Sequence, residues 1–176
     1  MNRLQQSLVL VGTAVVFVGG AALGTQLLLA PTGADSDDIA TCETQTIAAG
    51  DPLQSSMITV DIFNAGETAG LANRVRINLE DRGFLGGRIG NSGSNVSPAN
   101  VAILTENQDD PVVQLVASQF NGDVEFAEPD IDIENAVTVI LGPGYQDLRA
   151  DAPTEIEAGQ ETSVCVPTID LENPEG

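Results

Sequence analysis

An uncharged apolar segment near the N-terminus constrains this chain more than any other feature. Residues 7–30 contain no charged side chain, and the segment exceeds the roughly 20 residues that a helix needs to cross a bilayer core. Arg3 precedes it, and acidic residues follow it from Asp35 onward. Because positive charge favours the cytoplasmic side, we expect a single-pass plasma-membrane protein, with residues 1–6 inside, a transmembrane helix over 7–30 and the rest outside.

A cleaved signal peptide is the alternative interpretation of this segment. Signal peptides usually contain about 7–15 apolar residues, fewer than are present here. Cleavage after the small pair Ala21-Ala22 would also leave the apolar run Leu27-Leu28-Leu29 in the mature chain. A retained anchor is therefore favoured. Both interpretations place residues 31–176 outside the cytoplasm.

The charge of the external part excludes several classes of function. The 176 residues include 26 acidic side chains and six arginines, with no lysine or histidine, for a net charge of −20. Since a nucleic-acid-binding surface must be basic, we expect no nucleic-acid partner. The absence of histidine excludes His-based catalytic triads and His–zinc sites. No pair of acidic residues stands out as a catalyst, so we predict no enzymatic activity and no cofactor.

One acidic pattern resembles the start of a calcium-binding loop. Asp130, Asp132 and Glu134 alternate as the first ligands of such a loop would. The loop also needs a glycine at its sixth position, where this chain has Asn135. Ile131 and Ile133 favour an extended segment instead, so we predict no metal site.

The two cysteines, Cys42 and Cys165, are placed as a disulfide would require. An even number of cysteines in an extracytoplasmic domain favours a disulfide. These two flank the segment with the strongest secondary-structure pattern, so a bond would tie its ends together. The chain-entropy model gives about 4–5 kcal/mol for closing a loop on the order of 100 residues. Two free thiols are the alternative.

Apolar periodicity divides the external part into three regions. Residues 31–56 are rich in Pro, Gly, Ser, Thr and Asp and are typical of a linker. Residues 57–148 form the expected domain, and residues 149–176 form a C-terminal extension with an edge strand near 162–166 and an acidic tail. The expected strands cover 57–64, 84–90, 101–105, 124–126 and 137–141, and the expected helices cover 67–82 and the stretch from Asp109-Asp110-Pro111 to Asn121-Gly122.

The order of these elements predicts an α+β fold. A strand, a helix and a strand are followed by a second strand, helix and strand, which favours a βαββαβ-like sheet with two helices on one face. Gly83 follows the first helix, as expected for a glycine just after a helix C-terminus. The transmembrane helix precedes this domain.

Two motifs in this domain occur in a recognisable order. The first runs from a strand into Asn64, continues through Gly70-Leu71-Ala72 and an amphipathic helix, and ends at Gly83-Phe84. The second is a closing strand followed by Gly142 and Tyr145. Together they resemble the LytR C-terminal domain family. In the turn after Asn64, Gly66-Glu67 stands where that family usually has Ser or Thr followed by Gly.

This resemblance implies a stand-alone, membrane-anchored form of the family, without the LytR–CpsA–Psr catalytic domain, for which the chain is too short. It implies a non-enzymatic role in cell-envelope or cell-wall assembly or integrity, through binding of wall polymer or of an envelope protein. One alternative is a subunit of a membrane complex, recruited through a helix in which Gly20 and Gly24 allow close packing. A carboxylate-dependent wall-polymer hydrolase or transferase is a further alternative.

The turn formed by Asn64, Gly66 and Gly70 is a candidate ligand contact. Backbone N–H groups at the start of a helix can bind an anionic or polar ligand. The structural interpretation is that Asn and Gly are needed for the turn itself. That interpretation is favoured.

A cluster of arginines forms the second candidate site. Arg74, Arg76, Arg82 and Arg88 fall within fifteen residues and could form a basic patch for an anionic wall polymer. Arg74 and Arg76 lie about 200° apart around a helix, so they do not share a face. Solvated ion pairs with acidic neighbours such as Glu80 are the favoured interpretation.

Overall fold

The computed structural model describes residues 42–133 and 135–167. The expected anchor over 7–30 lies outside these residues, as do Glu134 and the acidic tail from residue 168. Within the described part of the chain, no helix is long and apolar enough to cross a membrane.

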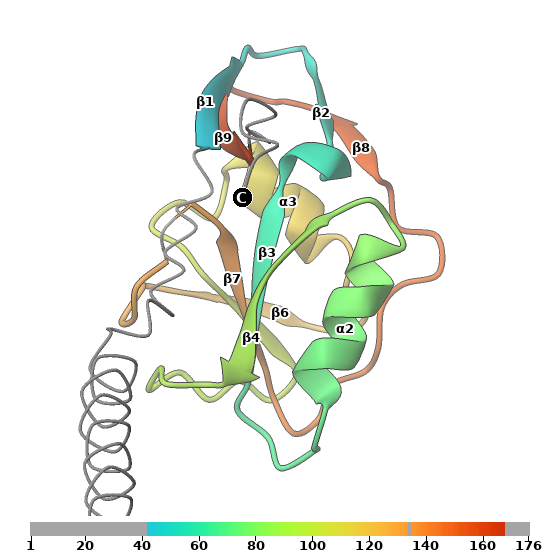
Figure 1. Ribbon diagram of the computed structural model, residues 1–176, viewed down its shortest axis with the longest axis vertical. Helices are drawn as coiled ribbons and strands as arrows, with labels where there is room; N and C mark the ends of the chain where they lie inside the picture. Colours follow the sequence, from blue (N-terminus) through green and yellow to red (C-terminus); the bar gives the residue numbers. More distant parts are fainter. Residues whose placement is uncertain (1–41, 134, 168–176) are drawn as a thin grey trace, which may run out of the picture. The chain divides into compact units, whose positions relative to one another are not determined.

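Over the described residues, the fold combines one five-stranded sheet, two two-stranded ribbons and two α-helices, which confirms the expected α+β class (Figure 1). The first half of the chain forms β1 (Cys42–Ile47), β2 (Pro52–Gln54), the 3-10 turn η1 (Ser55–Met57), β3 (Thr59–Asn64), α2 (Leu71–Glu80) and β4 (Leu85–Asn91). The second half forms β5 (Val101–Leu104), α3 (Pro111–Ala117), β6 (Val124–Ala127), β7 (Val137–Leu141), β8 (Glu155–Glu157) and β9 (Thr162–Pro167).

The central sheet is built from two βαβ units joined by β7. Its strand order is β4-β3-β7-β5-β6. The first βαβ unit, residues 59–91, pairs β3 with β4 in parallel, and the second, residues 101–127, pairs β5 with β6 in parallel. Strand β7 runs parallel to β3 and antiparallel to β5. The two units therefore point in opposite directions, and their helices begin at opposite ends of the sheet.

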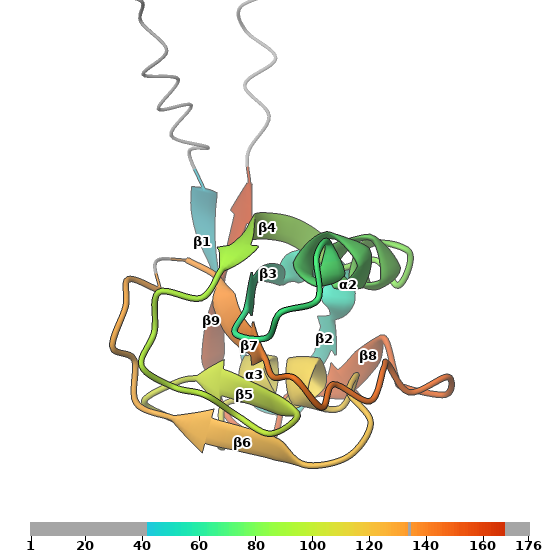
Figure 2. The ribbon, with the colours of Figure 1, turned by 90° about the horizontal axis from the view of Figure 1, so that it is seen from below.

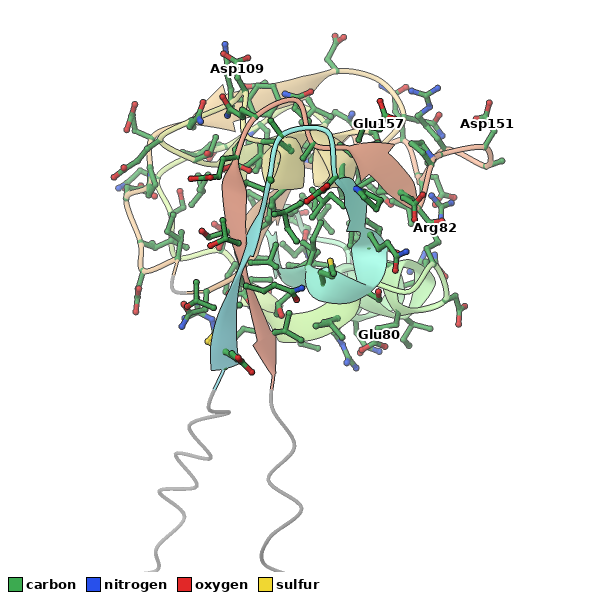
Figure 3. The ribbon with its side chains drawn as sticks, turned by 90° about the horizontal axis from the view of Figure 1, so that it is seen from above. Glu80, Arg82, Asp109, Asp151 and Glu157 are labelled. Carbon is green, nitrogen blue, oxygen red and sulfur yellow. A yellow bond between two sulfur atoms is a disulfide. The ribbon has the colours of Figure 1, made fainter. Side chains whose placement is uncertain are left out.

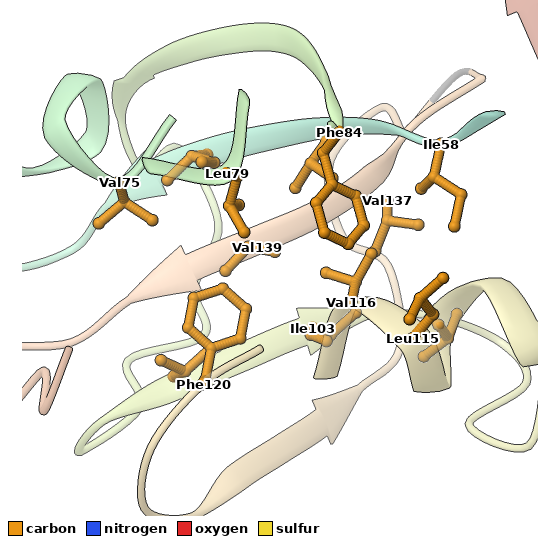
Figure 4. Packing of buried hydrophobic residues seen from close by; sticks show 14 of the residues in the cluster. Ile58, Val75, Leu79, Phe84, Ile103, Leu115, Val116, Phe120, Val137 and Val139 are labelled. Carbon is orange, nitrogen blue, oxygen red and sulfur yellow. The ribbon is translucent and has the colours of Figure 1, made fainter. Parts of the chain in front are cut away.

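Both helices cover the same face of this sheet, as the sequence predicted (Figure 2). Apolar side chains of α2 recur at helical spacing, and four of them are buried: Leu71, Ala72, Val75 and Leu79. Figure 4 shows Val75 and Leu79 converging with side chains of α3 and of β7. One continuous hydrophobic core therefore holds both units together.

Residues 42–56 correct the prediction of a linker over 31–56. Strand β1 pairs antiparallel with β9, and β2 pairs antiparallel with β8. Ile47 and Leu53 of these strands are buried in the core, as are Ala158 and Val164 from the predicted C-terminal extension. The linker composition was misleading because residues 43–46 of β1 are all exposed, so the strand lacks the usual apolar alternation.

The disulfide between Cys42 and Cys165 is confirmed, with a Cα–Cα distance of 5.3 Å. It lies in the β1–β9 ribbon, where the two ends of the described chain run side by side (Figure 1). The bond closes a loop with a sequence separation of 123 residues. It therefore ties the start of the domain to its end.

The opposite face of the sheet is covered by loops. Ile131 and Ile133, whose alternation suggested an extended segment, lie in a loop outside the strands. They pack with Phe63 against a small buried cluster formed by Ala102, Leu104 and Ile140. This second cluster explains why apolar residues alternate in a segment that forms no strand.

Candidate functional site

A hollow lies at the carboxyl ends of β3 and β4, beside the start of α2. It is lined by residues 64–73, which form the β3–α2 loop and the first turn of the helix, and by residues 89–92 at the end of β4. Its volume is about 700 Å³. We call it the α2 hollow. It contains all three residues of the predicted ligand-contact turn, Asn64, Gly66 and Gly70.

Asn64 builds the loop that borders this hollow. Its side-chain oxygen accepts a hydrogen bond from the backbone N–H of Gly66 at 3.0 Å, and its amide donates to the carbonyl of Thr68 at 2.9 Å. Its own carbonyl accepts from the N–H of Ser92 at 2.8 Å, across to the end of β4. The amide is thus used within the loop, in agreement with the structural interpretation of this turn.

Gly70 starts α2 without a side-chain cap. Its φ of 72° lies in the left-handed region that glycine adopts readily, and no side chain accepts a hydrogen bond from the first turn. The first N–H groups of a helix have no partner within the helix, and they carry the positive end of the helix dipole. Leu71, Ala72 and Asn73 line the hollow. The N–H of Leu71 donates to the carbonyl of Thr68 at 3.4 Å, whereas those of Ala72 and Asn73 have no partner in the described structure. These two free donors suit the carbonyl, hydroxyl or carboxylate oxygens of a ligand.

The side chains around the hollow are mostly neutral and polar. Thr68, Asn73, Asn91 and Ser92 contribute hydroxyl and amide groups, and Glu67 is the one charged residue of the lining. No group of three or more metal-binding side chains occurs in the described part of the chain. The hollow therefore offers hydrogen bonds to uncharged groups more than it offers a charge or a metal.

The four clustered arginines do not form one patch. Arg76 pairs with Glu80 on α2 at 2.7 Å, which confirms the ion-pair interpretation for this residue. Arg82 donates to the side-chain oxygen of Gln119, just after the end of α3, at 3.0 Å. Arg88 pairs with Asp61 on the other face of the sheet. The basic-patch hypothesis is therefore wrong, because three of these arginines are held in different places by different partners.

The Asp61–Arg88 pair is a structural feature that the sequence analysis missed. The Asp61 carboxylate is only 2% exposed and accepts from both the backbone N–H (2.6 Å) and the Nε (2.7 Å) of Arg88. The guanidinium also lies 5.9 Å from the ring centre of Phe63. A Cβ on Gly87 would overlap this carboxylate. An acidic residue inside an apolar strand, opposite a Gly-Gly-Arg segment, is the signal that could have revealed it.

The closing motif of the sequence, Gly142 and Tyr145, lies beside the same end of the sheet. A side chain on Gly142 would overlap the carbonyl of Pro98, so the chain requires glycine there. Tyr145 packs edge-to-face on Phe120, with ring centres 6.4 Å apart. Its hydroxyl is buried without a hydrogen-bond partner in the described part of the chain. Burial, with the nearby Asp147 carboxylate, raises the pKa of Tyr145 above its ordinary 10.0.

Comparison with known proteins gives two findings. Residues 57–145 match the family model described as LytR cell envelope-related transcriptional attenuator. A solved structure, the soluble domain of a conserved hypothetical secreted protein from Mycobacterium marinum, is 20% identical with a TM-score of 0.45, covering 59% of this chain and 70% of the other. Among curated proteins, none matches significantly. With a family model covering half of its length, the chain belongs to the LytR C-terminal domain family, which is related to the cell envelope.

Proposed function

We propose that this chain is a non-enzymatic, membrane-anchored extracytoplasmic domain that supports cell-envelope assembly or integrity by binding wall polymer in the α2 hollow. Membership of a cell-envelope-related family supports the setting. The Cys42–Cys165 disulfide supports an extracytoplasmic location, because such bonds persist in oxidising compartments.

The position and lining of the α2 hollow carry this proposal. Ligands of sheets with parallel strands bind beyond the carboxyl ends of the strands, where the hollow lies. Its free N–H groups at the start of α2 and its hydroxyl and amide side chains match the hydroxyl and acetamido groups of a glycan. The exposed side chain of Ile89, 42% accessible, adds an apolar contact for the face of a sugar ring.

The path of the chain suits binding at a distance from a membrane. The described chain begins at Cys42 and ends at Pro167, both in the β1–β9 ribbon. This ribbon shares a cavity with Thr59 and Val137, which lie at the amino ends of β3 and β7. The α2 hollow lies at the carboxyl ends of the same strands (Figure 1). A tether preceding Cys42 would therefore leave the hollow at the far end of the domain.

Co-sedimentation with purified wall sacculi tests the proposal. The full-length chain in detergent is expected to sediment with sacculi at both low and moderate salt, because the hollow binds through hydrogen bonds more than through charge. Ala69→Trp fills the hollow from its exposed rim and should abolish retention. Gln108→Trp, in the exposed β5–α3 loop, is the matched control and should leave retention unchanged.

Two outcomes would contradict the proposal. Equal retention of the two tryptophan variants would show that polymer binds elsewhere on the chain. Absence of retention for the unmodified chain would indicate an envelope protein as the partner, and crosslinking in intact membranes would identify it.

A further inference from the structure

A second hollow lies on the other side of the first turn of α2. It has a volume of about 440 Å³ and lies between the face of α2 from Leu71 to Asn78 and the loop over 143–147. We call it the Tyr145 hollow. Thr68 and Leu71 line both hollows, so the two adjoin at the start of the helix.

Two opposite charges border the Tyr145 hollow, and neither is neutralised. Arg74 is exposed and has no ion pair or side-chain hydrogen bond within residues 42–133 and 135–167, unlike Arg76. Asp147 is also exposed. It adopts a φ of 77°, and its carboxylate accepts a hydrogen bond only from the adjacent N–H of Leu148 in the described structure. Both charges thus remain available to a ligand.

Tyr145 lines the same hollow as these two charges. Its hydroxyl has no hydrogen-bond partner in the described part of the chain, which is unusual for a buried polar group. Burial and then Asp147 raise the pKa of this hydroxyl, whereas Arg82 and then Arg74 lower it. A tyrosine with its ordinary pKa of 10.0 is already protonated at neutral pH, and burial raises this pKa further, so the hydroxyl is a hydrogen-bond donor.

Building on the proposed function, we propose that the Tyr145 hollow is a second subsite that binds an amino-acid head group, with its carboxylate at Arg74 and its ammonium at Asp147. A purely anionic group would be repelled by Asp147, and a purely cationic one by Arg74. A group with both charges satisfies the two side chains together, and a small movement of the Tyr145 ring would let its carboxylate accept from the buried hydroxyl. A glycan whose peptide branches carry a residue with both its amino and its carboxyl group free would thus place sugar in the α2 hollow and that residue's head group in the Tyr145 hollow.

Binding of soluble disaccharide–peptide fragments of peptidoglycan to the full-length chain in detergent tests this inference. Arg74→Gln should weaken binding of fragments with a free head group about tenfold. It should have no effect on fragments whose carboxylate is amidated. Asp147→Asn keeps a residue that tolerates positive φ, and it should weaken binding of free fragments but not of N-acetylated ones. Arg149→Gln is the matched control for the change of charge.

Tyr145→Phe separates a binding role from a structural one. Because the hydroxyl has no partner in the described structure, its removal should leave the unfolding midpoint unchanged while binding weakens several-fold. The inference is overturned if Arg74→Gln and Arg149→Gln bind alike, or if Arg74→Gln weakens binding of amidated and free fragments equally.

Peptide-free glycan strands distinguish this inference from the proposed function. If the strands bind and Ala69→Trp abolishes their binding, while fragments show no dependence on the head group, the proposed function stands and the second subsite is wrong. If neither strands nor fragments bind, the proposed function fails and the subsite fails with it.

Discussion

The two βαβ units share one topology and one core but differ at the start of their helices. In the first unit, Gly70 opens α2 without a cap, and the free N–H groups border a hollow. In the second, the Asp110 side chain accepts from the N–H of Val112 at 2.8 Å and Pro111 begins α3. Asp110 also accepts from the hydroxyl of Thr162 on β9 at 3.0 Å. The same architecture therefore leaves one helix start open to a ligand and closes the other internally.

The units also differ in charge. Residues 59–91 hold four arginines and four acidic residues, whereas residues 101–127 hold five acidic residues and no basic one. Figure 3 shows Asp109 and Glu157 near α3 and β8, and Glu80 at the opposite edge of the domain. The acidic side repels polyanions, so an anionic wall component can approach the first unit more easily than the second.

Shortening a core side chain in either unit should lower the free energy of unfolding by a similar amount. This is the largest loss of stability that we expect. Leu79 of α2 and Leu115 of α3 are both fully buried in the common core. Leu79→Ala and Leu115→Ala should each lower the free energy of unfolding by about 2–5 kcal/mol, through lost burial and the resulting cavity. Urea denaturation followed by circular dichroism measures this. A large loss for only one variant would show that the units do not share a core.

Removing the buried carboxylate of the first unit should cause the next largest loss of stability. Asp61→Ala deletes charged hydrogen bonds to Arg88 and should cost about 2 kcal/mol. The cost is moderate because the Arg88 side chain is 51% exposed and can be hydrated. Glu80→Ala, which breaks the exposed pair with Arg76, is the control and should cost less than about 0.5 kcal/mol. Similar losses for both variants would contradict the role assigned to burial.

We expect the uncapped start of α2 to require glycine at position 70 for full stability. Gly70→Ala places a side chain at a φ of 72° and should lower stability by about 1 kcal/mol. A Cβ at Gly70 meets no atom within 4 Å, so the loss comes from the backbone alone. Gly93→Ala is the matched control, because its Cβ also meets nothing and its φ is not positive. If the two variants unfold at the same urea concentration, the left-handed start is not required.

The smallest change in stability is expected for a substitution on β7, the strand that joins the two units. The hydroxyl of Thr138 is fully buried and has no hydrogen-bond partner in the described part of the chain. Thr138→Val keeps the shape and removes the hydroxyl, so stability should stay within about 0.5 kcal/mol of the original or rise. Thermal unfolding measures this change. A loss above about 1 kcal/mol would mean that the hydroxyl is bonded in solution.

The sequence predicted most of the central sheet, because the helices bury helically spaced apolar residues and the strands β5 and β7 are short runs in which every residue is buried. The predicted strand over 137–141 coincides with β7, and the helix predicted over 67–82 contains α2. The ribbon strands β1, β2 and β8 were missed. They are short or mostly exposed, and each buries at most one or two side chains, so no local pattern marks them.

The candidate site could be predicted only where its residues are close in sequence. Asn64, Gly66 and Gly70 form one turn and do line the α2 hollow. The Tyr145 hollow combines α2 with a loop some seventy residues later, and only the pairing of β3 with β7 brings them together. Arg88 was considered together with its neighbours along the chain, as a basic patch or in ion pairs with nearby acidic residues, but its partner Asp61 lies on the adjacent strand.

Site-specific photocrosslinking in the native envelope would test the central claim most directly, that the first unit carries the ligand site and the second does not. A photoreactive amino acid would replace Ala69 in the β3–α2 loop or Gln108 in the β5–α3 loop of the full-length chain. Position 69 is predicted to give a high-mass product that disappears on digestion with a glycan-cleaving enzyme, and position 108 is predicted to give none. Equal glycan-sensitive products at both positions, or a product at position 108 alone, would contradict the account.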